Sequence, residues 1–305
     1  MFEKKSLVFY YCTTPLHMGA GTSVGAIDNP IQREVHSKHP VISGSGLKGA
    51  IRHHVTKQWQ NKDDKDDIVS LFGSETSSGE LTAGAISFTD ANLVAFPVRS
   101  LKNTFVYVTC PYVLARLKRM AILAGLSLEW DVTGLAGIGV TAAGDDAITS
   151  DGKLCLEALE FSCKNNKTTN DIANWLADNC LSGDENEYFQ EKIRSDLFVV
   201  SDDDFSYFVR NSTVVEPHVR IDDKTGTADG GALFYTENLP PESILCGIVL
   251  ASVERGNKEN KKDAETCLKK ILWNENTGIS GQLIQMGGDS TTGRGLVFVN
   301  AIKGE

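Results

Sequence analysis

Two side chains near the N-terminus carry groups that suit acid–base or metal chemistry. Asp28 lies in the segment GAIDNPIQRE, and His17 precedes the glycines of LHMGAG. A lone carboxylate can bind a hard cation or accept a proton, although by itself it forms no complete hydrolytic centre. Cleavage of RNA is a reaction for which one carboxylate can suffice, because the substrate's own 2′-hydroxyl is the nucleophile. Asp28 is therefore a candidate catalytic and metal-binding residue, and His17 is a candidate acid, base or RNA contact.

Each of these residues also has a plainer interpretation. Asp28 stands directly before Asn29-Pro30, where an aspartate commonly caps a turn, and His17 can equally be structural. No HExxH motif and no CxxC pair occurs, and the seven cysteines are scattered, which is typical of free thiols in a reducing compartment. The local sequence leaves both interpretations open.

The segment PVISGSGLKGAIR has the pattern of a phosphate site at the start of a helix. Serine hydroxyls, exposed backbone N–H groups and a nearby lysine favour phosphate at a helix N-terminus. Ser43 or Ser45 is the expected N-cap, and Lys48 and Arg52 lie one turn apart beside the apolar face. The alternative is a capped surface helix with two solvated cations.

A second candidate phosphate site is the segment GGDSTTGRG, from Gly287 to Gly295, between two predicted strands. It is not a Walker loop, because no GK[ST] follows, and not a dinucleotide fingerprint, because no helix follows. Successive backbone N–H groups around Gly287, Gly288 and Gly293 can form an anion nest, and Arg294 can add a bidentate phosphate contact. The alternative is a glycine hairpin.

The overall charge argues against general nucleic-acid binding, but the charge is uneven. The chain has 305 residues, of which 41% are apolar and 23% charged, with a net charge of −10. Between Phe96 and Met120 there are five basic residues, including Arg99 and Lys102, and no acid. A local basic face can bind phosphate whatever the sum, because screening limits each charge to about 10 Å. Neither a transmembrane run nor a signal peptide is recognisable, so we expect no membrane association and a cytoplasmic location.

The elements that must position these residues follow from the spacing of apolar side chains. Strands are predicted at residues 7–11, 81–88, 104–110, 244–253, 279–286 and 295–299, and helices at 46–59, 111–125 and 262–273. Residues 214–221 and 232–237 flank a polar turn and predict a β-hairpin. We expect a charged surface turn at 61–67 followed by a short helix up to Phe72, a loop at 126–150, and a polar surface insertion at 164–195 with one helical patch at about 172–176. The expected core residues of the helix at 262–273 are Cys267, Leu268, Ile271 and Leu272. In the helix after Pro111, Arg116 is expected on a basic face, and Ile122 and Leu123 on the buried face.

This order of elements is β-α-β-β-α-β, which predicts an α+β fold with a ferredoxin-like (RRM-like) sheet. We expect one domain over residues 1–305. Its sheet would be built from about 1–90 and 243–305, with an insertion at about 91–242 that includes a hairpin near 213–237. Topology of this kind does not establish a function.

Five segments, in the same order over nearly the whole chain, resemble one family: LHMGAGTSVGAIDNPIQRE, PVISGSGLKGAIR, PVRSLKNTFVYVTCPYVLARLKR, RIDDKTGTADGGALFYTENLP and GGDSTTGRGLV. They resemble the RAMP superfamily, and within it the backbone subunits of type III-B CRISPR effectors, the fourth subunit of the Cmr complex. The resemblance implies a ferredoxin-like palm with a protruding β-hairpin thumb. It also implies copies that stack into a helical filament along a guide RNA, with each thumb displacing a guide–target base pair.

The resemblance also implies a role for each candidate residue. Target RNA would be cleaved at regular intervals in a metal-dependent reaction (Mg²⁺ or Mn²⁺), with Asp28 as cleavage residue and metal ligand. His17 matches the histidine before the first glycines, and Glu237 is a possible auxiliary residue, although Asn238 stands where a tyrosine is common. Contacts to the guide backbone would come from Ser45, Lys48, Arg52, Arg99, Lys102, Gly287, Gly288, Gly293 and Arg294.

The implied partners are guide RNA, target RNA, further copies of the chain and the other Cmr subunits. Two alternatives stay open at this point. One is a non-catalytic subunit that only scaffolds the guide RNA. The other is a guide-processing endoribonuclease of the same superfamily, for which His17 would be the catalytic residue.

Overall fold

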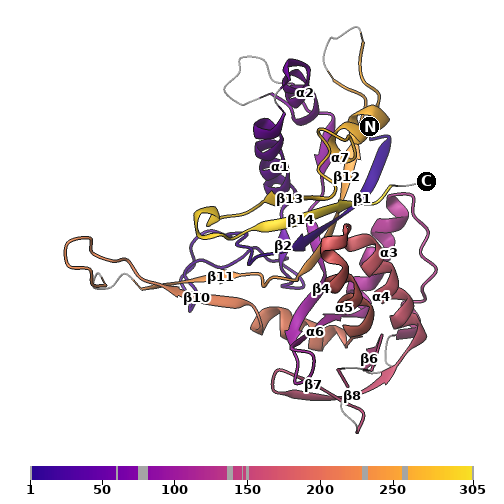
Figure 1. Cartoon of the computed structure of the whole chain (residues 1–305), viewed down its shortest axis with the longest axis vertical. Helices are drawn as coiled ribbons and strands as arrows, with labels where there is room; N and C mark the ends of the chain where they lie inside the picture. Colours follow the sequence, from indigo (N-terminus) through magenta and orange to yellow (C-terminus); the bar gives the residue numbers. More distant parts are fainter. Residues whose placement is uncertain are drawn as a thin grey trace.

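A mostly antiparallel sheet of twelve strands forms the centre of this mixed α/β protein, shown as a computed structural model in Figure 1. The structure describes residues 2–59, 61–74, 82–135, 140–145, 147–148, 151–228, 233–255 and 260–303. The main strand order is β13-β14-β1-β12-β4-β5-β9-β6-β8-β7, with β2 paired to β4 and β3 paired to β12. Among the described pairs, β5 with β9 and β6 with β8 are parallel.

The strands and helices have the following bounds. The strands are β1 (Lys4–Cys12), β2 (Val41–Ile42), β3 (Ile86–Phe88), β4 (Ala91–Arg99), β5 (Phe105–Thr109), β6 (Val140–Ala142), β7 (Lys153–Leu156), β8 (Leu159–Asn165), β9 (Leu197–Val199), β10 (Val214–His218), β11 (Phe234–Asn238), β12 (Ile244–Ala251), β13 (Gln282–Gln285) and β14 (Leu296–Ala301). The α-helices are α1 (Gly44–Gln58), α2 (Lys62–Phe72), α3 (Pro111–Leu123), α4 (Lys167–Cys180), α5 (Glu187–Asp196), α6 (Asp202–Asn211) and α7 (Ala264–Leu272).

Helices cover both faces of the central strand β1. Val8 and Tyr10 point to the core shared with α1, α2 and α7, whereas Leu7, Phe9 and Tyr11 point to the core shared with α3, α4 and α5. Their exposed fractions are between 0% and 3%. An RRM module stacks bases on the open face of its sheet. No such face is open at β1, because helices cover both sides of the strand, so β1 has no surface on which a base could stack.

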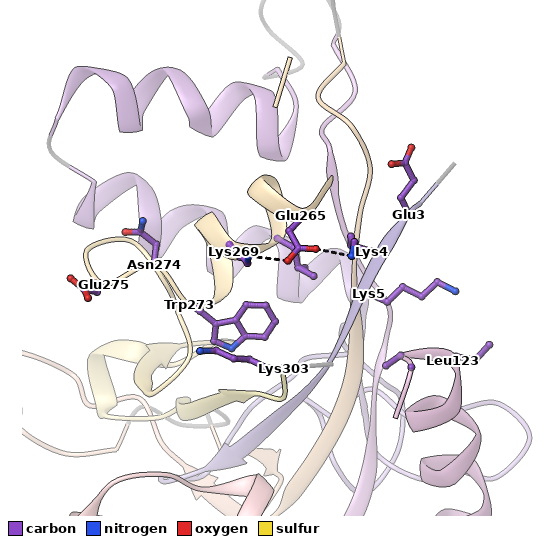
Figure 2. Close-up of a pocket in the computed structure, with 13 residues that line it drawn as sticks. Glu3, Lys4, Lys5, Leu123, Glu265, Lys269, Trp273, Asn274, Glu275 and Lys303 are labelled. Atoms are coloured by element: carbon purple, nitrogen blue, oxygen red, sulfur yellow. Dashed lines mark ion pairs between the residues drawn. The ribbon is translucent and has the colours of Figure 1, made fainter. Parts of the chain in front are cut away.

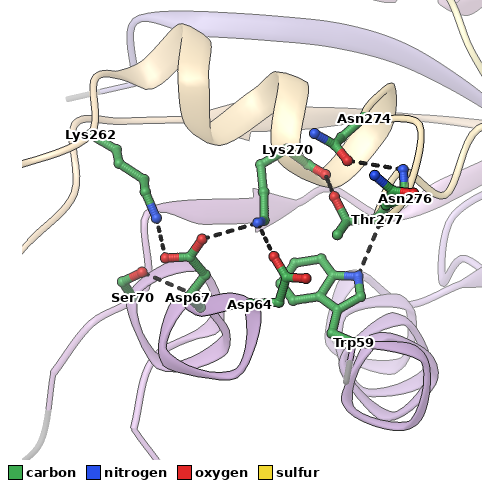
Figure 3. A network of polar contacts seen from close by, with 9 residues as sticks. All are labelled: Trp59, Asp64, Asp67, Ser70, Lys262, Lys270, Asn274, Asn276 and Thr277. Atoms are coloured by element: carbon green, nitrogen blue, oxygen red, sulfur yellow. Dashed lines mark hydrogen bonds and ion pairs between the residues drawn. The ribbon is translucent and has the colours of Figure 1, made fainter. Parts of the chain in front are cut away.

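Helix α2 begins earlier than the sequence predicts. Residues 62–67 are helical and not a surface turn, and Asp64 and Asp67 are buried. Figure 3 shows why: Lys262 and Lys270, next to and within α7, form ion pairs with these two carboxylates. The indole of Trp59, at the end of α1, donates a hydrogen bond to Thr277 O at 3.2 Å in the same region. The acidic run therefore joins α2 to α7.

Several features in the middle of the chain differ from the predictions. Residues 164–195 are not a surface insertion, because α4 buries a stripe of side chains against the sheet. β4 was not predicted as a strand, and it extends the sheet beyond β12. On α3, Arg116 is buried while Ile122 and Leu123 are exposed, the reverse of what the spacing predicts. The region predicted as loop contains β6 and a 3-10 turn at Thr133–Leu135, and residues 136–139, 146 and 149–150 lie outside the described residues.

The predicted hairpin is present as a separate two-stranded sheet. β10 pairs with β11 in the register Val214↔Asn238 to His218↔Phe234. The pair extends away from the central sheet, toward the left of Figure 1. Residues 229–232, where the second strand was expected to begin, lie outside the described residues. Across the part of the chain that the structure describes, no helix is long and apolar enough to cross a membrane.

Candidate active site

A long irregular segment, residues 15–40, crosses from the end of β1 to the start of α1, and we call it the strap. One side of the strap follows β11. Leu16 and Leu239 exchange two backbone hydrogen bonds of 2.9 Å, Asn29 N donates to Tyr235 O at 3.0 Å, and Glu237 N donates to Asn29 O at 3.0 Å. The strap therefore occupies the edge of β11 that β10 leaves open.

The carboxylate of Asp28 is held by this strand and not by its own turn. Asp28 Oδ2 accepts a hydrogen bond of 2.7 Å from the backbone N–H of Tyr235. Asp28 is half-buried, and no partner for Oδ1 occurs among the described residues. The turn-cap interpretation fails here, because the side chain reaches across to β11. One carboxylate oxygen is fixed, and the other is left for a substrate or a cation.

His17 is attached to the same edge of β11, two residues further on. Its Nδ1 lies 2.7 Å from Glu237 O. A carbonyl oxygen only accepts hydrogen bonds, so Nδ1 must carry the proton and Nε2 is the basic atom of the neutral ring. Tyr235 and Glu237 are two residues apart on β11, so their Cα atoms are about 7 Å apart along the strand. The structure thus brings the two predicted catalytic residues together on one strand edge.

Glycines make room for the His17 ring. Gly288 N donates to His17 O at 2.9 Å. A Cβ at Gly287 would lie 2.3 Å from His17 O, one at Gly288 would lie 3.2 Å from His17 Cδ2, and one at Gly19 would lie 3.0 Å from His17 Nε2. Gly287 also has a φ of +72°, which non-glycine residues rarely adopt. The segment from Gly287 to Gly295 therefore positions His17.

Glu237 is a buried carboxylate that anchors the strap. It is 3% exposed and accepts hydrogen bonds from Arg33 Nη2 at 2.6 Å, Thr213 Oγ1 at 2.8 Å and Ile31 N at 3.1 Å. Arg33 also donates to Val209 O, in α6, at 2.9 Å. These contacts use both oxygens of the carboxylate. The arrangement favours a positioning role for Glu237 over proton transfer.

A second buried ion pair anchors Glu34, the residue after Arg33, to helix α3. Glu34 Oε1 lies 2.6 Å from Arg116 Nη1 of α3, and Ser37 Oγ donates to Glu34 Oε2 at 2.5 Å. Burial by itself would raise the pKa of Glu34, but the hydrogen bonds from Ser37 and Arg116 outweigh burial and hold that pKa below its ordinary value. Arg116 is therefore an anchor of the strap and not part of an exposed basic face.

Comparison with known proteins identifies the family of this chain. The family model for the RAMP superfamily matches residues 9–298. The chain belongs to the RAMP superfamily. It is 36% identical to the CRISPR system Cmr endoribonuclease Cmr4 of Pyrococcus furiosus, over 97% of this chain and 95% of that protein. It is 26% identical to the CRISPR system CMR subunit Cmr4 of Saccharolobus solfataricus, over 95% and 94%.

A solved RAMP structure has the same fold. The crystal structure of oligomeric Cmr4 from Pyrococcus furiosus superposes on this chain with a TM-score of 0.70 and 29% sequence identity. The superposition covers 98% of this chain and 97% of that one. The similarity therefore extends over nearly the whole length of both chains.

In this RAMP protein the start of α1 is an exposed site that suits phosphate. Ser43 is the N-cap and accepts a 3.3 Å hydrogen bond from Gly46 N, while Gly44 N donates to Asp90 Oδ1 at 2.7 Å. Ser45 is exposed, its hydroxyl donates to Ser43 Oγ at 3.3 Å, and its N–H has no partner among the described residues. Burial, and after it the charges of Arg52 and Arg255, lower the pKa of Lys48. The cluster is basic, and it includes Arg255, which the sequence did not single out.

Arg294 is not free in this structure. Its Nη2 lies 2.6 Å and 2.5 Å from the two carboxylate oxygens of Glu216, in β10. Several backbone N–H groups of the glycine loop are also used, because Gly288 donates to His17 O and Gly295 to Pro15 O. These contacts favour a structural joint between loop, strap and hairpin over an anion nest, and RNA contacts at Gly293 and Arg294 stay predictions.

Arg99 and Lys102 are not brought to this site. Arg99 lies at the end of β4, 3.0 Å from Glu157, and Lys102 Nζ donates to Ile148 O at 2.7 Å. The start of α1 lies beside the first residues of β4, so Arg99 is about 25 Å away from it along the strand. These two residues belong to a different part of the surface.

Sequence reasoning missed three groups that hold the site. Arg33 and Thr213 bind Glu237, and the backbone N–H of Tyr235 binds Asp28. Nearly every residue has a backbone N–H, so the residue type at position 235 does not show that its N–H binds Asp28. Arg33 stands in the same GAIDNPIQRE segment as Asp28. Its position beside a candidate catalytic residue was a reason to look for a buried acidic partner.

Proposed function

We propose that this chain is the RNA-cleaving backbone subunit of a type III-B Cmr effector, with Asp28 as the cleavage residue. The observation that supports this proposal most directly is the attachment of Asp28 and His17 to one edge of β11, with Asp28 Oδ1 left open. The named activity of the Pyrococcus relative, a CRISPR Cmr endoribonuclease, supports the same reaction. Its partners would be guide RNA, target RNA, further copies of the chain and other Cmr subunits.

We also propose that part of the central sheet is a ferredoxin-like palm. The strands β14, β1, β12 and β3 lie side by side in that order and are antiparallel, with α1 and α7 on one face. This is the order of a ferredoxin-like sheet, and it supports a palm built from about residues 1–90 and 243–305. The hairpin β10–β11 would be the thumb of the same single domain, within the insertion at about 91–242.

The proposed reaction is an attack by the 2′-hydroxyl of the target on its adjacent phosphate. The O2′–P bond forms, the P–O5′ bond breaks, the 2′-hydroxyl proton passes to a base and the O5′ leaving group receives a proton. The open oxygen of Asp28 or the free Nε2 of His17 can accept the first proton. Both are fixed by β11, so neither has to be ordered when RNA binds.

A divalent cation, Mg²⁺ or Mn²⁺, would find only one carboxylate ligand at this site. The described residues contain no group of three or more His, Cys, Asp or Glu that could hold a metal ion. Mg²⁺ commonly uses one or two carboxylates together with substrate phosphates and water. Asp28 Oδ1 would be the protein ligand, and the cation would supply charge stabilisation at the phosphate.

Guide RNA would bind by its backbone at the start of α1. Ser45 offers an N–H and a hydroxyl, and Lys48, Arg52 and Arg255 supply positive charge close to it. Contacts of this kind do not depend on sequence, which a guide-binding subunit requires. We expect Lys48→Ala to weaken guide binding equally for different guides. The slope of log affinity against log salt concentration is expected to fall by about 1, the value for one lost phosphate contact.

The hairpin has the surface of a wedge. Several large apolar side chains are exposed near its far end, among them Val219, Ile221 and Leu233, and the rings of His218 and Phe234 stack 5.2 Å apart. Exposed aromatic and aliphatic groups can replace a displaced base in a stack. Because Tyr235 of the same hairpin holds Asp28, the cleavage residue would always face the deformed step.

The test is Asp28→Asn in the assembled effector. The amide keeps an oxygen for the Tyr235 N–H but loses the charge, so we expect target cleavage to disappear while assembly and RNA binding remain. Asp171→Asn, at an exposed position of α4 away from the strap and the hairpin, is the matched control and keeps full cleavage. Unchanged cleavage by Asp28→Asn refutes the assignment and leaves a scaffolding role. Cleavage of guide-precursor RNA by the isolated chain would instead favour the processing nuclease. The cytoplasmic location stays a prediction.

A further inference from the structure

Arg294, in the glycine loop (residues 287–295), is held by a carboxylate of the hairpin. Its Nη2 lies 2.6 Å from Oε1 and 2.5 Å from Oε2 of Glu216, in β10. Both carboxylate oxygens thus share one nitrogen, and Nη1 and Nε of Arg294 have no partner among the described residues. Arginine binds a carboxylate or a phosphate most strongly through two nitrogens at once. The pair therefore leaves part of the binding capacity of the guanidinium unused.

Solvent reaches the carboxylate of this ion pair, unlike the carboxylate that anchors the strap. The side chain of Glu216 is 28% exposed, whereas that of Glu237, which binds Arg33, is 4% exposed. Asn238 Nδ2 also donates to Glu216 Oε2, at 3.4 Å. A partly exposed pair contributes little to folding stability, so a partner from solution can replace one of its members. A phosphate of RNA is such a partner, because its oxygens can bind two guanidinium nitrogens.

The backbone that carries Arg294 is fixed, so a change of partner needs only a movement of side chains. Gln285 Nε2 donates to Arg294 O at 2.7 Å, and Gly295 N donates to Pro15 O at 2.8 Å. Glycines of the same loop also pack against His17. Arg294 therefore stays close to the proposed cleavage residues whichever partner it binds.

A cavity at the other end of β1 lacks a comparable open donor for an anion. It has a volume of about 760 Å³ and lies between the start of β1, the end of α3, and α7 with the turn after it (Figure 2). Among the described residues, its unpaired lysines, Lys5 and Lys303, are matched by two unpaired acids, Glu3 and Glu275. Figure 2 shows Lys5 pointing away from Trp273 and Lys303. The lining of this cavity therefore gives no preference for a phosphate.

We propose that Glu216 is an autoinhibitory partner of Arg294, and that a phosphate of RNA displaces it. This exchange rests on the proposed function, because it needs RNA beside the glycine loop. In the free chain Glu216 occupies the guanidinium and places a negative charge where the phosphate would bind, so unselected RNA is bound weakly. When a phosphate takes the guanidinium, the hairpin loses its ion pair to the loop. RNA binding and this release of the hairpin then favour each other by the same factor.

The first test is the affinity of the full chain for a labelled single-stranded RNA, measured by fluorescence anisotropy at low salt without divalent cations. We expect Glu216→Gln to raise the affinity about threefold or more, and Arg294→Met to lower it and to reduce the salt slope by about 1. In the double variant the gain from Glu216→Gln disappears, because the arginine that Glu216 blocks is absent. Asp171→Asn, at an exposed position of α4, removes the same charge elsewhere and is expected to change the affinity much less.

The second test shows whether the phosphate belongs to the guide or to the target. Cryo-electron microscopy of the assembled effector is carried out with guide RNA alone and with guide and target RNA together. A phosphate on Arg294 with guide alone identifies the guide, and a phosphate that appears only after target is added identifies the target. Both results support the exchange if Glu216 has left the guanidinium. The unaltered protein is used, so this test does not require that any variant folds.

Three results would overturn the exchange. One is that Glu216→Gln raises the affinity no more than Asp171→Asn does, which would make the effect one of net charge. Another is that the gain persists in the double variant without Arg294. The last is that Glu216 still binds Arg294 in both maps of the effector. Failure of the proposed function is seen separately, as unchanged target cleavage by Asp28→Asn, whatever the binding measurements give.

Discussion

The anchor of the strap gives the sharpest test of how the site is held. Arg33 and Glu237 form a buried ion pair, in which the side chains are 18% and 4% exposed. Glu237 also accepts hydrogen bonds from Ile31 N and Thr213 Oγ1. Removing one partner of a buried pair typically costs about 3–5 kcal/mol, because the other charge stays buried without compensation. We expect Glu237→Gln and Arg33→Met each to lower the free energy of unfolding by about that amount.

The effect on cleavage separates positioning from proton transfer. Asp28 lies on the same strap as Arg33, and a shift of about 1 Å in a reacting group can reduce a rate by about a hundredfold. If Glu237 only positions the strap, both single variants lose cleavage to a similar extent, and the double variant is no worse than either. If Glu237 transfers a proton, Glu237→Gln loses cleavage whereas Arg33→Met keeps most of it.

The measurements are urea unfolding of the four proteins in this double-mutant cycle and single-turnover target cleavage by the assembled effector. Cleavage is measured at a temperature at which all four remain folded. Arg99→Met with Glu157→Gln is the matched exposed pair, with side-chain exposures of 74% and 31%, and its coupling is expected to be no more than about 1 kcal/mol. A coupling below about 0.5 kcal/mol for Arg33 and Glu237 would refute the proposed anchor.

Three further predictions test other parts of the structure. Gly287→Ala pushes a Cβ to within 2.3 Å of His17 O and is expected to impair cleavage, whereas Gly293→Ala, at a φ of +80° but in open space, costs only about 1 kcal/mol of strain in urea unfolding. Lys270→Met leaves two buried aspartates of α2 without this partner and is expected to destabilise by about 3 kcal/mol, against about 0.5 kcal/mol or less for exposed Lys269→Met. Burial raises the pKa of Glu242 from 4.5 to about 7, so the folded state binds the proton more tightly and stability falls as the pH rises through that range. Glu242→Gln removes this fall, about 1–2 kcal/mol after allowance for partial exposure, in unfolding measured from about pH 5 to about pH 8.

Apolar patterning predicted the elements whose burial is continuous. β1 reads LVFYY because helices cover both of its faces, and such a run indicates a central strand. On α7 the expected core residues Cys267, Leu268, Ile271 and Leu272 are all buried. In these two elements the burial follows the spacing of the apolar side chains, as predicted.

Patterning failed where burial depends on a distant partner. Asp64 and Asp67 look like surface residues, and they are buried only because Lys262 and Lys270, about 200 positions later, neutralise them. The same holds for Arg116, which pairs with Glu34. Long-range ion pairs of this kind leave no periodic signal.

One failure was avoidable. Within the polar region 164–195, Ile172, Ala173, Leu176, Ala177 and Cys180 repeat at helical spacing, and they form the buried stripe of α4. The sequence showed the helical patch at about 172–176, but the polar composition of the longer window around it led to the prediction of a surface insertion.

The candidate site was found by residue type, but its organisation was not. Asp28 and His17 were identified from the segments around them, and the structure attaches both to β11 through main-chain atoms of Tyr235 and Glu237. A main-chain donor or acceptor is present at nearly every position, so the sequence does not show which one is used.

Three contacts made by side chains join the strap and the glycine loop to the hairpin. Asp28 is bonded to Tyr235 in β11, His17 to Glu237 in β11, and Arg294 of the glycine loop to Glu216 in β10. A displacement of the hairpin must therefore carry both proposed catalytic groups with it, or break several hydrogen bonds together. In the proposed function, the hairpin that deforms the target duplex also carries the carboxylate that cuts it. The cleavage position is then set by the hairpin and not by the base sequence of the target, which explains how one chain can cut any target that its guide selects.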